Sequence, residues 1–391
     1  MNSSQVKETQ DTWHHVLQRL AERALGKKQG QALCAKYRSL TTENYRSLVA
    51  PRFALKDMLH LERLPAVECP SAGILNPFQK IEHYRLHFYS REERFLDEYI
   101  PVLENLHLRA MDQVQFIADV EGTPYFIKSF TIKPAQNPCV PIARLRSRLL
   151  EAIQAILAAR VENDALNKLI ILTGMDGQEI DVLRAYRNYY LQLGHRTSRA
   201  SIHHALLCNP GVALCLYHYF DARFRPYREG EDTLFREEQA LLPMHLELLQ
   251  SMEKVVDLND DRILRNLFNL IDATMRCNFH LRRNSPDYFI AFKIDSLGVI
   301  EMPPPKPQYE IYVHAAAMQG IHLRAGKVSR GGIRWSDRPD DFRGEILGLM
   351  QTQINKNALI VPTGAKGGFV LTSNGLRSDL KEAGKQAYLT L

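Results

Sequence analysis

The spacing of apolar residues changes character several times along the chain. Residues 5 to 65 show a weak helical period and are mostly polar, and a proline-bearing break follows. From Tyr84 to Tyr89, apolar and polar residues then alternate, and a period of two predicts a strand. From 140 to 280 the period is helical, and after 285 strand patterns return in "DYFIAFKID" and "EIYVHA". The chain therefore predicts a mixed α+β protein.

The first strand pattern opens a small module. Ser90 and Glu93 have the spacing of a capping box, which predicts a helix running on to Leu103. The segments "MDQVQFIADV" and "TPYFIKSFTI" flank "EG" and predict a hairpin. The order β-α-β-β over about 80 to 133 is similar to ACT-like modules, a shape that often senses small molecules. A structural or assembly role for this module is an open alternative.

The helical region has two clear amphipathic stripes. Asn259 or Asp260 is expected to cap the second helix. The residues that share a face are Ile142, Leu145, Leu149, Ile153 and Ile156 in the first helix, and Ile263, Leu267, Leu270, Ile271 and Thr274 in the second. The stiff segment "MPPPKPQ" and the returning strands place a boundary near 286. We expect four segments: a helical 1–75, the module at 76–136, a helical 137–285, and 286–391.

Composition is that of a soluble globular protein, with 45% hydrophobic and 24% charged residues and a net charge of +6. The basic residues are scattered, which disfavours nucleic-acid binding. No apolar run approaches the roughly 18 residues that span a bilayer, and the polar N-terminus is unlike a targeting segment. The six cysteines show no Cys-x-x-Cys spacing, so we expect reduced thiols, no metal site and a cytoplasmic location.

Candidate chemistry concentrates in the last 65 residues. In "SRGGIRW", Arg330 stands beside Gly331 and Gly332, a combination that suits an anion approaching the backbone, although the same residues also make an ordinary turn. A helix is predicted from about 341 to 357. At 100° per residue, Gln353 and Lys356 continue the apolar stripe of that helix. Lys356 therefore either lines an anion pocket or reaches solvent at the negative end of the helix.

The stretch "VPTGAKGGF" carries four chemistry-bearing residues. Lys366 stands between Gly364 and the pair Gly367 and Gly368, with no Ser or Thr following, so it is not a Walker phosphate loop. No Gly-x-Gly-x-x-Gly fingerprint occurs in the chain either. We interpret these glycines as clearance that lets a substrate lie against the backbone. The lysine beside them could serve as an acid, a base or a carbonyl polariser.

Together, "RGGIRWSDR…DFRGEILGLMQTQINKNALIVPTGAKGGF" closely resembles the large NAD-specific glutamate dehydrogenases of bacteria. The strongest match covers about 310 to 372, and the upstream order of elements is also similar. The resemblance implies that Lys366 is catalytic and that Gln353 and Lys356 hold the α-carboxylate. The residue before the first Gly-Gly is lysine in small members of the family and is Arg330 here. The charge is kept while the reach and geometry change.

The implied reaction is the NAD-dependent oxidative deamination of L-glutamate to 2-oxoglutarate and ammonia by the full-length parent, expected to be a homo-oligomer. The resemblance also implies that residues 286–391 are the start of an α/β substrate domain without a Rossmann domain. NAD would then be bound by a C-terminal domain absent from this chain, and the fragment alone would be inactive. The alternative is a non-catalytic module that binds a dicarboxylate, regulates or oligomerises.

Overall fold

The computed structural model describes residues 3–64, 71–75, 83–136, 141–356, 362–372 and 379–391. The chain forms two compact units, 1–158 and 159–391. We describe each unit by itself. The mixture of helices and strands agrees with the mixed fold class expected from the sequence, while the finer division into four segments stays a prediction.

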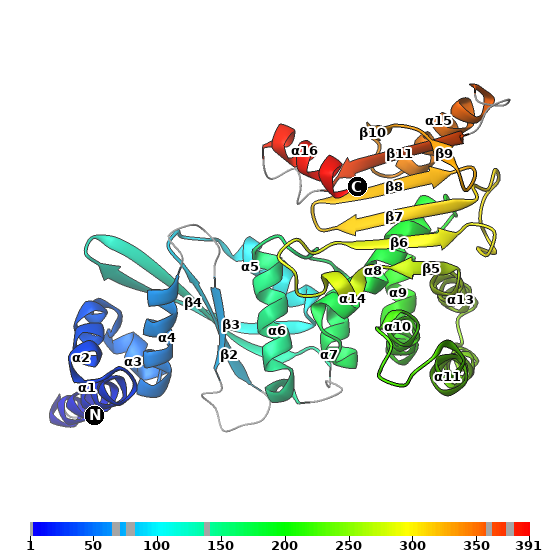
Figure 1. Ribbon diagram of the computed structural model, residues 1–391. Coiled ribbons are helices and arrows are strands. Elements are labelled where there is room, and N and C mark those ends of the chain that lie inside the picture. The colour runs from blue at the N-terminus through cyan, green and yellow to red at the C-terminus, as the bar shows by residue number, and fades with distance from the viewer. Residues whose placement is uncertain (1–2, 65–70, 76–82, 137–140, 357–361, 373–378) are drawn as a thin grey trace. The chain divides into compact units, whose positions relative to one another are not determined.

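The first unit combines helices with an antiparallel sheet whose strand order is β1-β2-β4-β3 (Figure 1). Its strands β2, β3 and β4 with helix α5 follow the predicted β-α-β-β order, and β1 adds an edge strand beside β2. The elements are α1 (Ser3–Leu25), α2 (Lys27–Lys36), α3 (Glu43–Leu48), α4 (Pro51–Arg63), β1 (Ser71–Leu75), β2 (Tyr84–Ser90), α5 (Leu96–Asn105), β3 (Leu108–Val120), β4 (Thr123–Pro134) and α6 (Ile142–Leu157).

The predicted hairpin is confirmed. Strands β3 and β4 are joined by Glu121 and Gly122, whose φ angles are 54° and 79°. Two consecutive residues with positive φ form the turn whose twist matches that of paired strands. The five apolar residues predicted for the helix after the hairpin are also all buried in α6.

The predicted start of α5 is wrong. Ser90 is still paired with Phe126 in the sheet, and its hydroxyl donates to the carbonyl of Glu92 at 2.6 Å. The helix begins at Leu96 instead, and the carboxylate of Glu98 accepts a hydrogen bond from the backbone N–H of Phe95 at 3.0 Å. The capping-box spacing at Ser90 was therefore a coincidence inside a strand end.

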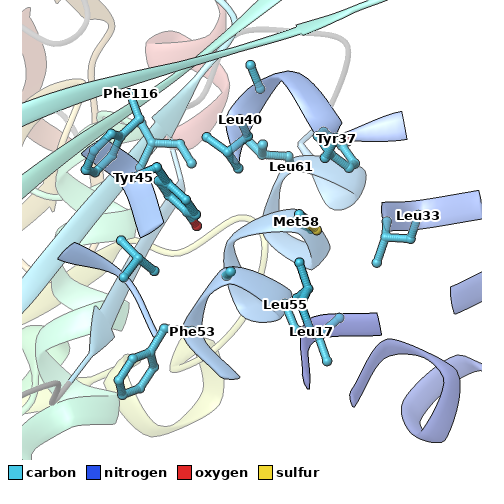
Figure 2. Packing of buried hydrophobic residues seen from close by; sticks show 14 of the residues in the cluster. Leu17, Leu33, Tyr37, Leu40, Tyr45, Phe53, Leu55, Met58, Leu61 and Phe116 are labelled. Atoms are coloured by element: carbon cyan, nitrogen blue, oxygen red, sulfur yellow. The ribbon is translucent and has the colours of Figure 1, made fainter. Parts of the chain in front are cut away.

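One core of this unit lies between the helices α1 to α4 and the sheet. Figure 2 shows the side chains that fill it, which include Leu17, Leu33, Tyr37, Leu40, Tyr45, Phe53, Leu55, Met58, Leu61 and Phe116. Strand β2 is buried at every position, including Arg85 and His87. The alternation of apolar and polar residues located this strand correctly, but its polar residues face protein rather than solvent.

The second unit carries helices on a mixed sheet of order β10-β11-β8-β7-β6-β5, and β9 also pairs with β11. The elements are α7 (Leu169–Thr173), α8 (Gly177–Gln192), α9 (Arg199–Cys208), α10 (Pro210–Phe224), α11 (Thr233–Arg236), α12 (Leu242–Met252), α13 (Leu258–Asp272), β5 (Thr274–Cys277), α14 (Phe279–Arg282), β6 (Ile290–Asp295), β7 (Tyr309–Ala315), β8 (Met318–Arg324), β9 (Ser329–Arg330), β10 (Ile333–Trp335), α15 (Phe342–Lys356), β11 (Thr363–Leu371) and α16 (Leu380–Thr390).

Most of the elements predicted here are present, with two corrections. Helix α13 is capped by Asp257, whose carboxylate accepts from the N–H groups of Asn259 and Asp260 at 2.9 Å. The predicted caps Asn259 and Asp260 lie inside the first turn. Thr274, placed on the same helix face by the sequence, already belongs to β5.

Helix α8 is buried along most of its length and brings charged residues into the interior. Arg184 and Arg187 are fully buried. Arg184 donates to Asp164 at 2.9 and 3.0 Å and to Asp181 at 2.7 Å. Arg187 pairs with Asp164 and, at 2.9 Å, with Glu162. We call this set of five residues the ionic network of the second unit.

Candidate functional site

Strand β11 carries Lys366 on the face that packs against helix α15. A Cβ atom added at Gly364 would lie 2.8 Å from the backbone nitrogen of Ile354, and one added at Gly368 would lie 2.2 Å from the side chain of Ile346. Both contacts are with α15. Because side chains two positions apart on a strand share a face, Lys366 points to the same side as these two glycines. The part of "VPTGAKGGF" from Thr363 to Phe369 therefore lies in a strand.

Two short strands bring the "SRGGIRW" motif beside this lysine (Figure 1). Arg330 in β9 pairs with Gly364, and Ile333 in β10 pairs with Gly367, both in parallel register. The N–H of Gly367 also donates to the carbonyl of Gly332 at 3.0 Å. A Cβ added at Gly332 would lie 3.8 Å from Lys366 Nζ, so the ammonium group lies next to this glycine.

Packing explains most of these glycines, which corrects the interpretation that they all leave room for a substrate. A Cβ at Gly331 would lie 1.5 Å from the carbonyl oxygen of Ala365, and one at Gly367 would lie 3.0 Å from His322. Gly364 and Gly368 face α15 in the same way. Protein atoms therefore occupy the space beside four of the five glycines, and only Gly332 faces the lysine at ordinary contact distance.

Helix α15 follows the predicted stripe. Phe342, Ile346 and Met350 are buried, and Gln353 one turn further on is half-buried. Lys356, the last residue of the helix, is exposed. Gln353 also lies close to β11, because its carbonyl carbon would be 3.1 Å from a Cβ at Gly364. The structure therefore gathers Arg330, Gln353 and Lys366 around Gly364, with Lys356 one turn of helix beyond.

The charges at this site are unevenly paired. Arg334 forms an ion pair with Glu345 of α15, and the hydroxyl of Ser336 donates to the same carboxylate at 2.6 Å. Within the described ranges, no carboxylate forms an ion pair with Arg330, Lys356 or Lys366. Arg330 and Lys366 thus have no carboxylate partner among the described residues, and Lys356 adds an exposed positive charge at the end of α15. Such cations favour binding of an anion, and guanidinium and ammonium groups suit carboxylates.

Sequence reasoning missed the residues that hold α15 in place. Arg343 is buried and donates to Glu310 at 3.0 Å, and the same carboxylate accepts from the hydroxyl of Tyr189 in α8 at 2.8 Å. Gln192 accepts from the N–H of Arg343 at 3.2 Å and donates to the carbonyl of Pro339 at 2.9 Å. Arg343 lies about 100° away from Phe342 on the helix, so the apolar stripe placed it towards solvent.

The described residues include no group of three His, Cys, Asp or Glu side chains arranged to hold a metal ion. The adjacent histidines of α9 contact other protein side chains: His203 accepts from Arg187 at 2.6 Å, and His204 lies 3.2 Å from Asp260. In the same described part, no helix combines the length and the apolar character needed to cross a bilayer.

Comparison with known proteins matches three family descriptions to this chain. Residues 247–391 match the catalytic domain of bacterial NAD-glutamate dehydrogenase. Residues 161–226 match helical motif 3 of glutamate dehydrogenase, and residues 20–64 match its helical motif 2. The candidate site lies within the first of these matches, and helix α8 lies within the second.

Similar proteins carry the same description. The chain is 35% identical to the NAD-specific glutamate dehydrogenase of Halomonas elongata, over 92% of this chain and 22% of that protein. It is 34% identical to the protein of that name from Pseudomonas aeruginosa, over 95% and 23%, and 34% identical to that from Mycobacterium tuberculosis, over 88% and 21%. The chain thus spans about a fifth of the length of these relatives. These matches confirm the resemblance seen in the sequence: over most of its length the chain is similar to part of the bacterial NAD-specific glutamate dehydrogenases.

Proposed function

We propose that this chain contributes the substrate site to an NAD-dependent oxidative deamination of L-glutamate, which gives 2-oxoglutarate and ammonia. The observation that carries this proposal is the placement of Arg330 and Lys366 on the paired strands β9 and β11, with Gln353 beside Gly364 and no carboxylate partner for either cation among the described residues. The relatives' printed name, NAD-specific glutamate dehydrogenase, supplies the reaction. Because the chain covers only part of those proteins, the activity is proposed for the longer parent.

The proposed roles follow from position. Lys366 is the catalytic residue: as the neutral amine it takes a proton from the water that attacks the imine carbon, and as the resulting ammonium it donates a hydrogen bond to the oxygen that becomes the carbonyl of 2-oxoglutarate. Gln353 and Lys356 hold the α-carboxylate, since both belong to the end of α15. Arg330 holds the side-chain carboxylate through its forked donors. In this arrangement a dicarboxylate lies across β11 with a cation near each end.

The two glycines of the first motif receive different roles within that proposal. Gly331 is required for the contact with the Ala365 carbonyl, which sets the distance between β9 and β11. Gly332 is the residue whose missing side chain leaves space beside Lys366 Nζ. A substrate would therefore touch Gly332, while Gly331 would act by positioning the strand.

NAD does not fit the residues described in this chain. The strands of the second unit pair mainly antiparallel, and β9 and β10 are the two that run parallel to β11 among the described elements. Open nucleotide-binding sheets are built from parallel strands with a glycine-rich turn before a helix. We therefore derive no step through the cofactor here. We propose that a further part of the roughly fivefold longer parent binds it, as the relatives' length allows.

The test is a kinetic comparison in the full-length parent. Lys366→Ala is expected to lower kcat for glutamate-dependent NAD reduction by a factor of about 10² to 10⁴, the range typical of a lost proton-transfer group. Lys385→Ala is the matched control, because Lys385 is an exposed lysine of α16 with 67% of its side chain accessible. A Lys366→Ala parent with unchanged kcat and KM would overturn the catalytic assignment. A parent that never reduces NAD with glutamate would overturn the function.

A second function, for the isolated chain, is favoured by the same unpaired cations. Without a cofactor domain the site would bind a dicarboxylate and not turn it over. Calorimetry of the 391-residue chain with 2-oxoglutarate should then show binding that Arg330→Ala weakens. Heat without saturation would contradict this second role.

A further inference from the structure

A cavity of about 290 Å³ lies in the second unit, away from the residues proposed for the reaction. Asn188 and Gln192 of α8 line it together with Arg199 at the start of α9, Gln319 of β8, and Pro339 and Asp340. It shares no residue with the candidate site. Ligand pockets usually have volumes of about 300 to 1,000 Å³, so this cavity suits a small metabolite rather than a nucleotide.

The amide side chains in its wall are committed as hydrogen-bond acceptors. The carbonyl oxygen of Gln319 accepts from the hydroxyl of the buried Tyr312 at 2.8 Å. The carbonyl oxygen of Asn188 accepts two N–H groups of Arg187, at 2.8 and 3.1 Å. The N–H₂ group of Asn188 also lies 3.4 Å from Nδ1 of His314, whereas the N–H₂ group of Gln319 has no hydrogen-bond partner among the described residues. Gln319 therefore has both N–H groups available, which favours a ligand with an acceptor group such as a carboxylate.

Two charged side chains complete the wall with opposite signs. Arg199 uses one nitrogen to donate to Glu162 at 2.8 Å, and its guanidinium has further N–H groups. Asp340 is exposed and forms no ion pair with any residue of the described ranges. Its negative charge repels a ligand that is only anionic. A ligand that carries both a carboxylate and an ammonium group satisfies both ends.

Hydrogen bonds connect the wall of the cavity to the start of helix α15. Gln192 binds the carbonyl of Pro339 and the N–H of Arg343 with the two ends of one amide, and Pro339 and Asp340 are themselves cavity walls. Arg343 belongs to the first turn of α15, the helix that carries Gln353. A ligand that contacts this wall therefore changes the environment of the residues that fix the start of α15.

We propose that this cavity binds a small zwitterion of the α-amino-acid class, at a site distinct from the one that holds the substrate. The carboxylate lies towards Arg199 and Gln319, and the ammonium group lies towards Asp340. The binding itself does not depend on the proposed reaction. The consequence for α15, a change in the KM for glutamate, rests on the proposed function.

The test is ligand-observed NMR or calorimetry on the 391-residue chain with each of the twenty protein amino acids, and with succinate as the purely anionic probe. At least one amino acid should bind. Arg199→Ala should weaken its affinity about tenfold or more, and Lys366→Ala should leave the affinity unchanged. Asp340→Asn should weaken the binding of the amino acid and strengthen the binding of succinate. Arg262→Ala is the matched control, since Arg262 is another exposed arginine paired with one carboxylate, that of Glu301.

Three results would overturn the proposal: no amino acid binds, Arg199→Ala binds as the wild type does, or succinate binds better than every amino acid. If an amino acid no longer binds to the Lys366→Ala variant but still binds to the Arg199→Ala variant, it binds at the substrate site. That result would also overturn the proposal. Failure of the glutamate reaction in the parent leaves these binding outcomes untouched, so the two proposals can fail separately.

Discussion

Both units bury charged side chains, but they compensate them by different means. In the first unit Asp57 is fully buried and accepts hydrogen bonds from the hydroxyls of Tyr45 and Tyr89 at 2.5 and 2.8 Å, with His87 at 3.0 Å. In the second unit the ionic network pairs two buried arginines with three carboxylates. The carboxylate of Asp57 is thus stabilised by hydroxyl groups and an imidazole, whereas the three carboxylates of the ionic network are stabilised by guanidinium cations.

Because of this difference, the two clusters should respond differently when one interacting side chain is removed. A buried carboxylate held by several hydrogen bonds keeps some of them when one donor or acceptor is changed. A buried ion pair that loses its cation leaves an uncompensated charge, which is far more costly. Burial raises the pKa of Tyr45 and Tyr89 well above their usual value, so both hydroxyls stay protonated and able to donate.

The largest expected effect is in the ionic network. Arg184→Met should destabilise the second unit by about 3–5 kcal/mol, because Asp164 and Asp181 would lose their shared cation. Urea unfolding can report on each unit alone, since the two tryptophans, Trp13 and Trp335, lie in different units. A Trp13→Phe background leaves the second unit as the reporter.

The control for this variant is a surface arginine. Arg262→Met removes an exposed pair with Glu301 and should cost about 0–1 kcal/mol. Equal effects of the two substitutions would contradict the difference drawn between buried and exposed pairs. A loss of stability seen through Trp13 in a Trp335→Phe background, and not through Trp335 in the Trp13→Phe background, would show that the network does not stabilise the second unit.

An intermediate effect is expected for the carboxylate of the first unit. Asp57→Asn keeps the shape of the side chain and one of its oxygens. It replaces the other oxygen, which accepts a hydrogen bond, with an N–H₂ group that faces hydrogen-bond donors. We expect a loss of about 2 kcal/mol, followed through Trp13 in a Trp335→Phe background. Tyr45→Phe removes one donor and should cost about half as much. If Asp57→Asn were as damaging as Arg184→Met, the two clusters would not differ as proposed.

The smallest effect at neutral pH is a pH dependence that appears only in acid and sharpens the comparison. Burial, followed by the charge of Arg187, lowers the pKa of His203 to about 4, from about 6.5 in an unfolded chain. Asp164 and Arg199 also act on this imidazole, with opposite signs. Between these two pKa values the unfolded chain binds a proton that the folded chain does not. Stability should therefore fall as pH decreases from about 6.5 to 4, by at most about 1.4 kcal/mol per pH unit.

His203→Gln tests this contribution, because glutamine can still accept from the guanidinium of Arg187. Unfolding of the second unit, measured at several pH values in the Trp13→Phe background, should show a shallower slope for the variant. A slope identical to that of the wild type would assign the pH dependence to other groups.

The spacing of apolar residues predicted much of the fold, because these helices and strands are positioned by the burial of their apolar side chains. The hairpin at Glu121 and Gly122, the buried face of α6 and the strands β6 and β7 were all predicted from local pattern. The residues of the candidate site were also named from sequence, through the resemblance and the helix stripe. The structure adds that Arg330, Gln353 and Lys366 meet around one strand.

The rest depends on tertiary contacts that no local pattern carries. In "RAYRN" of α8, charged residues at helical spacing look like a solvated face, yet Arg184 and Arg187 are completely buried. Their partners Asp164 and Glu162 lie outside the helix, so only the folded chain brings them together. In the same way, the glycines of β11 cannot be told apart in sequence, although each faces a different neighbour.

Strand β11 uses its two faces for different purposes, and this has a practical consequence for preparing the protein. Phe369 and Leu371 belong to an apolar cluster with Val313, Met318 and Ala387, while Lys366 lies on the opposite face. A slip of one residue against β8 would turn every side chain over and put the lysine among apolar groups. On the proposed function, molecules with a slipped strand would lack the catalytic lysine altogether, and the turnover per milligram of a refolded parent would measure the fraction of molecules with the correct register.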